Sequence, residues 1–61
     1  MRLKELREAK GLTQADVAKA IACSSSNYAR YERGVREPDL ETLKLLSKFF
    51  GVSVDFIIGN D

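Results

Sequence analysis

The feature that most restricts the fold of this chain is a three-residue pattern that occurs three times: a small residue, an apolar residue, and a Ser or Thr. The sequence reads Gly-Leu-Thr at 11–13, Ala-Cys-Ser at 22–24 and Gly-Val-Ser at 51–53. Glycine enters the left-handed conformation that ends a helix without a steric penalty, and a Ser or Thr two residues later is a preferred N-cap. Each copy therefore predicts the end of one helix and the start of the next across a short turn.

Two further signals complete this division of the chain into helices. Asp39, directly after Pro38, is a fourth N-cap, and Gly34 and Gly59 are further helix stops. Between the stops, apolar residues recur at the spacing of one helix face. The sequence thus predicts an all-α fold with helices at about 2–10, 14–21, 25–33, 40–50 and 54–58. The side chains expected in the core are Leu6, Val17, Leu43, Leu46 and Phe50.

The size and composition of the chain exclude most catalytic functions. Its 61 residues allow one domain with a modest core and little volume for a deep pocket. There is no His and only one Cys, so the chain lacks an internal disulfide, zinc-finger spacing and a Ser-His-Asp triad. It also has no Gly-rich phosphate loop. We therefore expect no enzyme activity, no metal and no cofactor.

The same sequence gives no sign of a membrane or of export. No apolar run approaches the roughly 18 residues that a membrane span needs, and no signal-peptide pattern opens the chain. A single unpaired Cys favours a reducing compartment. We expect a cytoplasmic protein.

The net charge of +1 conceals an uneven distribution. Residues 1–36 hold eight Lys and Arg against four Asp and Glu, whereas residues 37–61 hold two against five. The first part could therefore approach a polyanion that the second part would repel.

Four separated motifs carry a resemblance to a known family. They are LTQADVA at 12–18, YERG at 31–34, EP at 37–38 and FGVSVD at 50–55. In this order they resemble the phage-repressor/Cro-type (xenobiotic-response-element, XRE) helix-turn-helix family of DNA-binding transcriptional regulators. The resemblance implies a compact, five-helix, lambda-repressor-like domain that binds double-stranded operator DNA, usually as a dimer. We expect residues 1–61 to form this single domain, either alone or as the N-terminal domain of a longer protein.

Two residues depart from the family pattern. Ala22 stands where the family usually has Gly, so it either takes the strained left-handed conformation or belongs to a different turn. Tyr28 stands where a smaller aliphatic residue usually faces the core, and its hydroxyl needs a partner. It either tilts the helix or reaches the surface.

The helix at 25–33 is the expected recognition helix for the major groove. Its period assigns Tyr28, Tyr31, Glu32 and Val35 to an inward stripe. The candidates for contact with base edges are Ser25, Ser26, Asn27, Ala29 and Arg30. The candidates for contact with phosphates are Thr13, Gln14, Arg33 and Arg36. Arg30 could bond a guanine or hold a phosphate, and the sequence leaves both open.

Other residues receive structural roles from the sequence and the resemblance. Arg7 and Glu32 match a pair that in the family forms a salt bridge between the first and third helices. The family's equivalent of Gln14 contacts phosphate and often braces the third helix. Cys23 is interpreted as a small apolar filler ahead of the third helix, with a redox sensor as the alternative.

The apolar end of the chain is the expected dimer surface. The candidates are Val54, Phe56, Ile57 and Ile58, although these side chains could instead close the core. The leading hypothesis is a repressor or Cro-like regulator that binds a palindromic operator as a homodimer. The alternative is a protein-interaction module on the same fold, such as an antitoxin that acts mainly through a protein partner.

Overall fold

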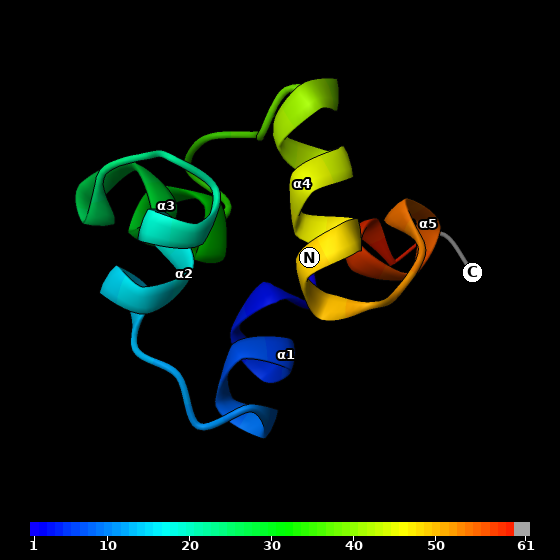
Figure 1. Ribbon diagram of the computed structural model, residues 1–61. Coiled ribbons are helices and arrows are strands. Elements are labelled where there is room, and N and C mark those ends of the chain that lie inside the picture. The colour runs from blue at the N-terminus through cyan, green and yellow to red at the C-terminus, as the bar shows by residue number, and fades with distance from the viewer. Residues whose placement is uncertain (60–61) are drawn as a thin grey trace.

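The structure, a computed structural model, describes residues 1–59. Figure 1 shows five α-helices and no strand in this part of the chain. They are α1 (Leu3–Ala9), α2 (Gln14–Ala20), α3 (Ser25–Arg33), α4 (Leu40–Phe50) and α5 (Val54–Ile58). The all-α, five-helix prediction is confirmed, and the predicted ends agree to within a residue.

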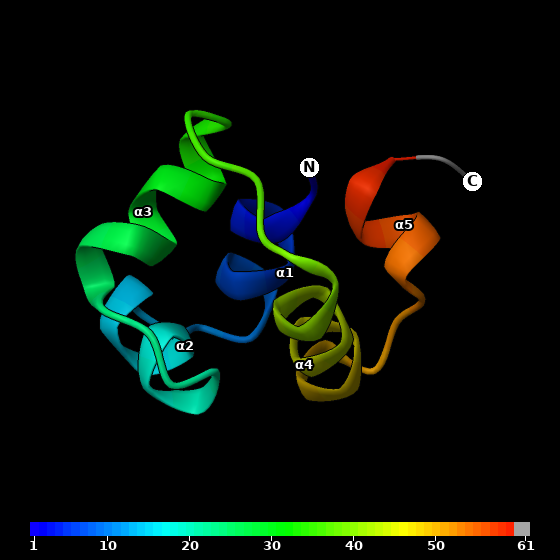
Figure 2. The same ribbon diagram turned by 90° about the horizontal axis from the view of Figure 1, so that it is seen from above.

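The helices pack into two groups that share one core. Helices α2 and α3 pack against each other, α4 packs against α5, and α1 contacts α3. In both ribbon views α2 and α3 lie on the opposite side of the molecule from α5 (Figures 1 and 2). The core is formed by Leu3, Val17, Ala18, Ile21, Tyr28, Tyr31, Leu46, Phe50 and Ile57. Leu6 and Leu43, which were also expected there, are half-buried and pack against it.

Four of the helices begin at the caps that the sequence indicated. The side-chain oxygens of Thr13, Ser24, Asp39 and Ser53 each accept a hydrogen bond from the backbone N–H three residues later. At Thr13 the exchange is reciprocal, because its own N–H donates to Asp16 Oδ2 at 2.9 Å. These caps satisfy N–H groups that have no partner within the helix.

The helix ends also follow the predicted pattern. Gly11, Gly34, Gly51 and Gly59 all have positive φ. Ala22 shares this conformation, with φ of 56°, and is the only non-glycine residue of 1–59 that does so. The structure thus decides between the two readings of Ala22: the turn keeps the family's left-handed geometry without the family's glycine.

One residue of the expected inward stripe was assigned wrongly. Val35 is 64% exposed, although the period of the recognition helix placed it inside. The helical period ends at Gly34, whose left-handed conformation redirects the backbone, so Val35 no longer follows the face of Tyr28 and Tyr31.

A contact that the sequence did not indicate joins the two ends of the domain. The Arg2 backbone N–H donates to the Ile57 carbonyl and its guanidinium donates to the Phe56 carbonyl, both at 2.8 Å. The same guanidinium lies 4.4 Å from the centre of the Phe56 ring. Arg2 therefore ties the start of α1 to the last turn of α5.

Candidate nucleic-acid interface

Helix α3 has one buried face and one exposed face. Tyr28 is fully buried and Tyr31 nearly so, and both anchor the helix in the core. The residues exposed on the opposite side are Ser25, Ser26, Arg30 and Arg33, while Asn27 and Ala29 are half-buried. The exposed face therefore carries short hydroxyls over the first turn and cations further along.

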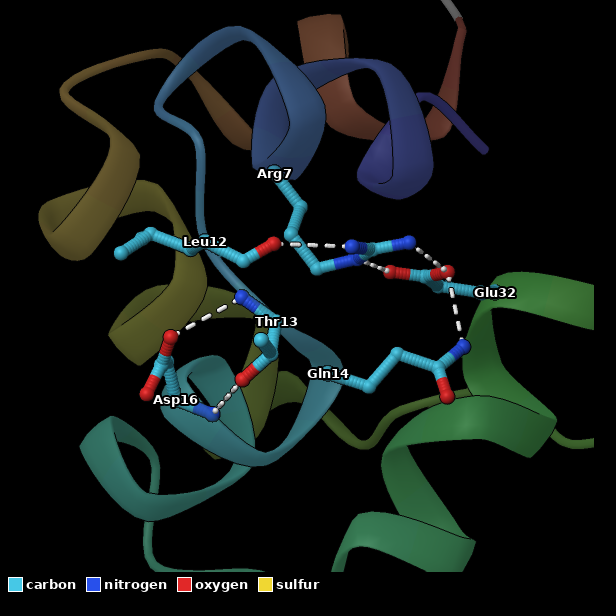
Figure 3. Close-up of polar contacts among 6 residues, drawn as sticks. All are labelled: Arg7, Leu12, Thr13, Gln14, Asp16 and Glu32. Atoms are coloured by element: carbon cyan, nitrogen blue, oxygen red, sulfur yellow. Dashed lines mark hydrogen bonds and ion pairs between the residues drawn. The ribbon is translucent and has the colours of Figure 1, made fainter.

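A polar network fixes α3 relative to the two helices that precede it. Arg7 Nε donates to Glu32 Oε2 at 2.6 Å, and Arg7 Nη2 donates to Glu32 Oε1 at 3.2 Å. A third donor, Gln14 Nε2, reaches the same Oε1 at 3.1 Å. Figure 3 shows the guanidinium and the amide converging on this carboxylate from α1 and α2. The ion pair between Arg7 and Glu32 is the one implied by the resemblance.

The network is largely shielded from water. The side chains of Arg7 and Glu32 are 13% and 4% exposed. Burial acts to raise the pKa of Glu32, but the hydrogen bonds from Arg7 and Gln14, with a contribution from the nearby Tyr28 hydroxyl, outweigh it and hold that pKa below its ordinary value. The carboxylate is thus charged at neutral pH and holds both donors. Arg7 also donates to the Leu12 carbonyl at 2.8 Å, which fixes the turn before α2.

The start of α2 presents two of the phosphate candidates. Thr13 is exposed, and its hydroxyl accepts from the Asp16 N–H at 3.1 Å, so it serves as the cap. Gln14 is half-buried and its amide is bound to Glu32. One N–H of that amide is committed to the protein, and the second remains for another acceptor.

Three arginines line the end of α3 and the segment after it. Arg30, Arg33 and Arg36 are exposed, and none of them forms an ion pair within residues 1–59. In α3 the first two are three positions apart and share one side of the helix. Unpaired, exposed guanidinium groups of this kind are suited to phosphate or guanine.

The Tyr28 hydroxyl and the Cys23 thiol are two polar groups that pack against the core behind this surface. The Tyr28 hydroxyl is shielded from water and lies close to the Glu32 carboxylate, but it forms no hydrogen bond of normal geometry within the described residues. Burial, followed by the nearby Glu32 carboxylate, raises the pKa of Tyr28. Tyr28 therefore does not reach the surface, which was one of the two expectations for it. Cys23 is half-buried and packs against the core, and burial raises the pKa of its thiol, in keeping with an apolar filler.

The residues expected at a dimer surface divide into two sets. Ile57 is fully buried in the core, so it cannot contact a second copy and its prediction as a dimer residue is wrong. The reason is that α5 has only five residues and buries its central face while Arg2 covers part of Phe56. Val54 and Phe56 are half-buried, and Ile58 is 40% exposed.

Beside Ile58 the surface is hollowed. A groove of about 480 Å³ lies where the N-terminus, the segment after α3, α4 and the end of α5 meet. Its lining residues are Met1, Gly34, Arg36, Glu37, Pro38, Leu43 and Ile58. Val35 lies between two of these residues in the chain, and Leu40 precedes Leu43 by three positions in α4. Both are 64% exposed, so the groove has apolar neighbours.

These features define a class of protein. A short turn joins two packed helices, and the second helix exposes hydroxyls and arginines while its other face is anchored in the core. This is the arrangement of a helix-turn-helix, in which α3 is the second helix. No cluster of three potential metal ligands occurs in residues 1–59, and none of the helices described is long and apolar enough to cross a membrane.

Comparison with known proteins identifies the family. A helix-turn-helix family model (HTH_3) matches residues 3–57. The chain belongs to this Cro/C1-type (XRE) helix-turn-helix family of DNA-binding transcriptional regulators, which are not enzymes. No solved structure matches the chain significantly.

Several curated regulators are similar over nearly the whole chain. The HTH-type transcriptional regulator ImmR of Bacillus subtilis is 42% identical over 60 residues, which cover 98% of this chain and 47% of ImmR. The cryptic phage CTXphi transcriptional repressor RstR of Vibrio cholerae is 34% identical over 97% of this chain and 53% of its own length. The transcriptional activator BcrR of Enterococcus faecalis is 35% identical over 98% of this chain and 29% of its own length. The chain spans about half the length, or less, of these relatives.

Proposed function

We propose that this chain is a repressor-type regulator that binds a palindromic operator as a homodimer, with α3 in the major groove. The observation that carries the proposal is the exposed face of α3, which combines hydroxyls and unpaired arginines on a helix anchored by two buried tyrosines. Occupancy of the operator would exclude polymerase or another regulator. Such a protein acts in the cytoplasm, and residues 1–61 form its DNA-binding domain.

The residues divide into those that read bases and those that bind phosphate. The proposed base contacts come from Ser25, Ser26, Asn27, Ala29 and Arg30. The short hydroxyls discriminate weakly and the Ala29 methyl fits against a thymine methyl, so Arg30 supplies the strongest discrimination if it bonds a guanine. The proposed phosphate contacts come from Thr13, Gln14, Arg33 and Arg36. These contacts fix the register of the helix and make the affinity depend on salt.

The first test is selection of bound duplexes from a random DNA pool, followed by titration of the selected duplex at several salt concentrations. We expect a palindromic consensus whose half-sites are about one helical turn apart, with a steep salt dependence. The absence of enrichment, with weak binding to every duplex, would contradict the proposal and favour a protein partner such as a toxin.

Single variants then assign the arginines. Arg30→Ala should flatten the preference among related duplexes if Arg30 reads a base, with a loss of about 1–3 kcal/mol on the preferred one. Arg33→Ala should weaken all duplexes alike and reduce the salt slope by about one. Lys48→Ala is a matched control, because Lys48 is an exposed cation on α4, outside the helix-turn-helix formed by α2 and α3. A uniform loss for Arg30→Ala would assign Arg30 to phosphate instead.

For the homodimer we propose the groove beside Ile58, occupied by the same surface of a second copy. A two-fold axis brings each patch against itself, so apolar neighbours such as Val35 and Leu40 would meet the groove of the partner. The groove carries adjacent charges of opposite sign, Arg36 and Glu37. Because Arg36 is also assigned to a phosphate contact, the proposed dimer contact depends mainly on the apolar neighbours of the groove.

This surface is tested by a pair of matched substitutions. Ile58→Asp should shift sedimentation equilibrium towards monomer and weaken binding to the full palindrome by at least about tenfold, as expected when one half-site contact is lost. Its binding to a single half-site should stay unchanged. Leu45→Asp is the control, because Leu45 is 43% exposed, close to the 40% of Ile58, but lies outside the groove. Equal effects of both substitutions would contradict the proposed surface.

A further inference from the structure

The buried Tyr28 hydroxyl is the group that the proposed function leaves unexplained. We propose that Tyr28 is a reserve donor for Glu32: when Gln14 turns towards a DNA phosphate, the Tyr28 hydroxyl takes its place on the carboxylate. This inference rests on the proposed phosphate contact of Gln14. It makes Tyr28 a positioning residue for DNA binding, although Tyr28 itself touches no DNA.

The position of Tyr28 on α3 brings its hydroxyl to the right neighbour. Tyr28 and Glu32 are four residues apart on one helix, and side chains at this spacing lie one above the other on the same face. The hydroxyl is buried close to the Glu32 carboxylate, but it forms no hydrogen bond of normal geometry within residues 1–59. Burial and the Glu32 carboxylate raise the pKa of Tyr28, so the hydroxyl keeps its proton and can donate it. A buried donor without a well-formed hydrogen bond is costly, and this one lies near enough to the Glu32 carboxylate to lower the pKa of that group.

The bonds at Glu32 differ in how easily they can be given up. Arg7 donates three hydrogen bonds, since Nε and Nη2 donate to Glu32 and Nη1 donates to the Leu12 carbonyl. Gln14 contributes a single bond of 3.1 Å, to an oxygen that it shares with Arg7. Figure 3 shows the Gln14 side chain reaching this carboxylate from the first residue of α2, with the exposed Thr13 beside it. Of the two side chains bound to Glu32, Gln14 is thus the one free to leave.

The departure of Gln14 would otherwise be unfavourable. The Glu32 side chain is only 4% exposed, so water has little access to the oxygen that Gln14 vacates. A buried carboxylate that loses a donor is destabilised unless another donor replaces it. In the exchange that we propose, the number of well-formed hydrogen bonds at Glu32 is kept, because the Tyr28 hydroxyl closes onto the carboxylate as Gln14 leaves it. The phosphate contact then forms without weakening the link between α1 and α3.

The experiment is a double-mutant cycle between Tyr28→Phe and Gln14→Ala. The probe is the duplex that the wild-type protein selects from a random pool. We expect Tyr28→Phe to unfold at the same temperature as the wild type or higher, because it removes a buried hydroxyl that has no well-formed hydrogen bond. Its affinity for the duplex should nevertheless fall by about three- to tenfold, the size of a coupling between neighbouring groups. In the Gln14→Ala background the same substitution should change the affinity by less than about twofold.

A matched control and a second readout keep the outcome decisive. Tyr31→Phe removes a hydroxyl from the same helix, at a tyrosine three residues from Tyr28 and equally part of the core, and should leave the affinity unchanged. In the wild type, the NMR signals of the Gln14 side-chain amide should shift on addition of the duplex, which can be measured even if Tyr28→Phe folds poorly.

The opposing results are equally specific. An equal loss of affinity in both backgrounds, no loss in either, or unshifted Gln14 signals would overturn the exchange. Gln14 would then keep Glu32 with one N–H and offer phosphate only the other. Failure of the wild type to enrich any duplex would overturn operator binding together with the exchange, whereas enrichment without a Tyr28 effect overturns the exchange alone.

Discussion

Replacement of Ala22 by glycine should stabilise the protein, because Ala22 occupies a backbone conformation that suits glycine. Its φ is 56°, and its N–H donates to Lys19 O while the next N–H donates to Ala18 O. The turn before α2 has the same pair of hydrogen bonds, from Gly11 to Glu8 O and from Leu12 to Arg7 O. The two turns therefore share one geometry, and only one of them has the residue that this geometry favours.

The size of the effect follows from two opposing terms. An L-residue in the left-handed region costs about 1–2 kcal/mol relative to glycine. Glycine in turn loses about 0.5–1 kcal/mol more conformational entropy on folding. Ala22 is exposed, so loss of its methyl group sacrifices little packing. The net gain for Ala22→Gly should be about 0.5–1 kcal/mol, or roughly 2–8 °C in the melting temperature of a domain of this size.

Thermal and urea unfolding of the purified protein would measure this gain. Gly11→Ala is the reciprocal control: its φ is 68° and a Cβ added there meets nothing within 4 Å, so its cost should be conformational alone. We expect the two substitutions to have opposite signs and similar magnitudes. Destabilisation by Ala22→Gly, or an unchanged stability after Gly11→Ala, would refute the reasoning from backbone strain.

Three other predictions concern the network, the core and the last cap. The lowered pKa of Glu32 means that its ionised form stabilises the fold above its ordinary value of 4.5, and that this contribution is lost as the pH falls through the lower folded pKa. Glu32→Gln should therefore be less stable than the wild type at pH 7 but lose less stability on acidification, as measured by urea unfolding at several pH values. Leu46→Ala, at a fully buried site of α4, should cost about 2–5 kcal/mol in the same assay. Ser53→Ala removes the cap that accepts from Phe56 N–H at 3.0 Å and should cost about 1 kcal/mol, detected as a lower melting temperature.

The helices could be predicted from the sequence because their boundaries depend on local chemistry. A cap such as Ser53 and a stop such as Gly51 act through the backbone within a few residues of themselves, so their effect is visible in the order of residues alone. The orientation of α3 followed for the same reason, since a period of 3.6 residues separates Tyr28 and Tyr31 from Arg30 and Arg33. The inward placement of Val35 was wrong because the prediction extended the helical period beyond Gly34, which ends α3.

Contacts between distant residues could not be read in the same way. Nothing near Arg2 in the sequence indicates that its guanidinium would lie on Phe56, because the contact spans 54 residues and exists only after the helices have packed. The Tyr28 hydroxyl is similar: the sequence raised the question of its partner, but only the packing shows that it is buried near Glu32 without a well-formed hydrogen bond. The ion pair between Arg7 and Glu32 was expected from the family resemblance and not from any local pattern.

The two long-range contacts give α1 a role that its sequence does not suggest. Arg7 joins α1 to α3 through Glu32, and Arg2 joins the start of α1 to the end of α5. Figure 2 shows α1 between these two helices. In a homodimer the distance between the two copies of α3 must match the roughly 34 Å between successive major grooves. That distance depends on how α3 is held relative to the surface beside Ile58. A helix with no proposed contact to DNA or to a partner would therefore set the spacing of the half-sites.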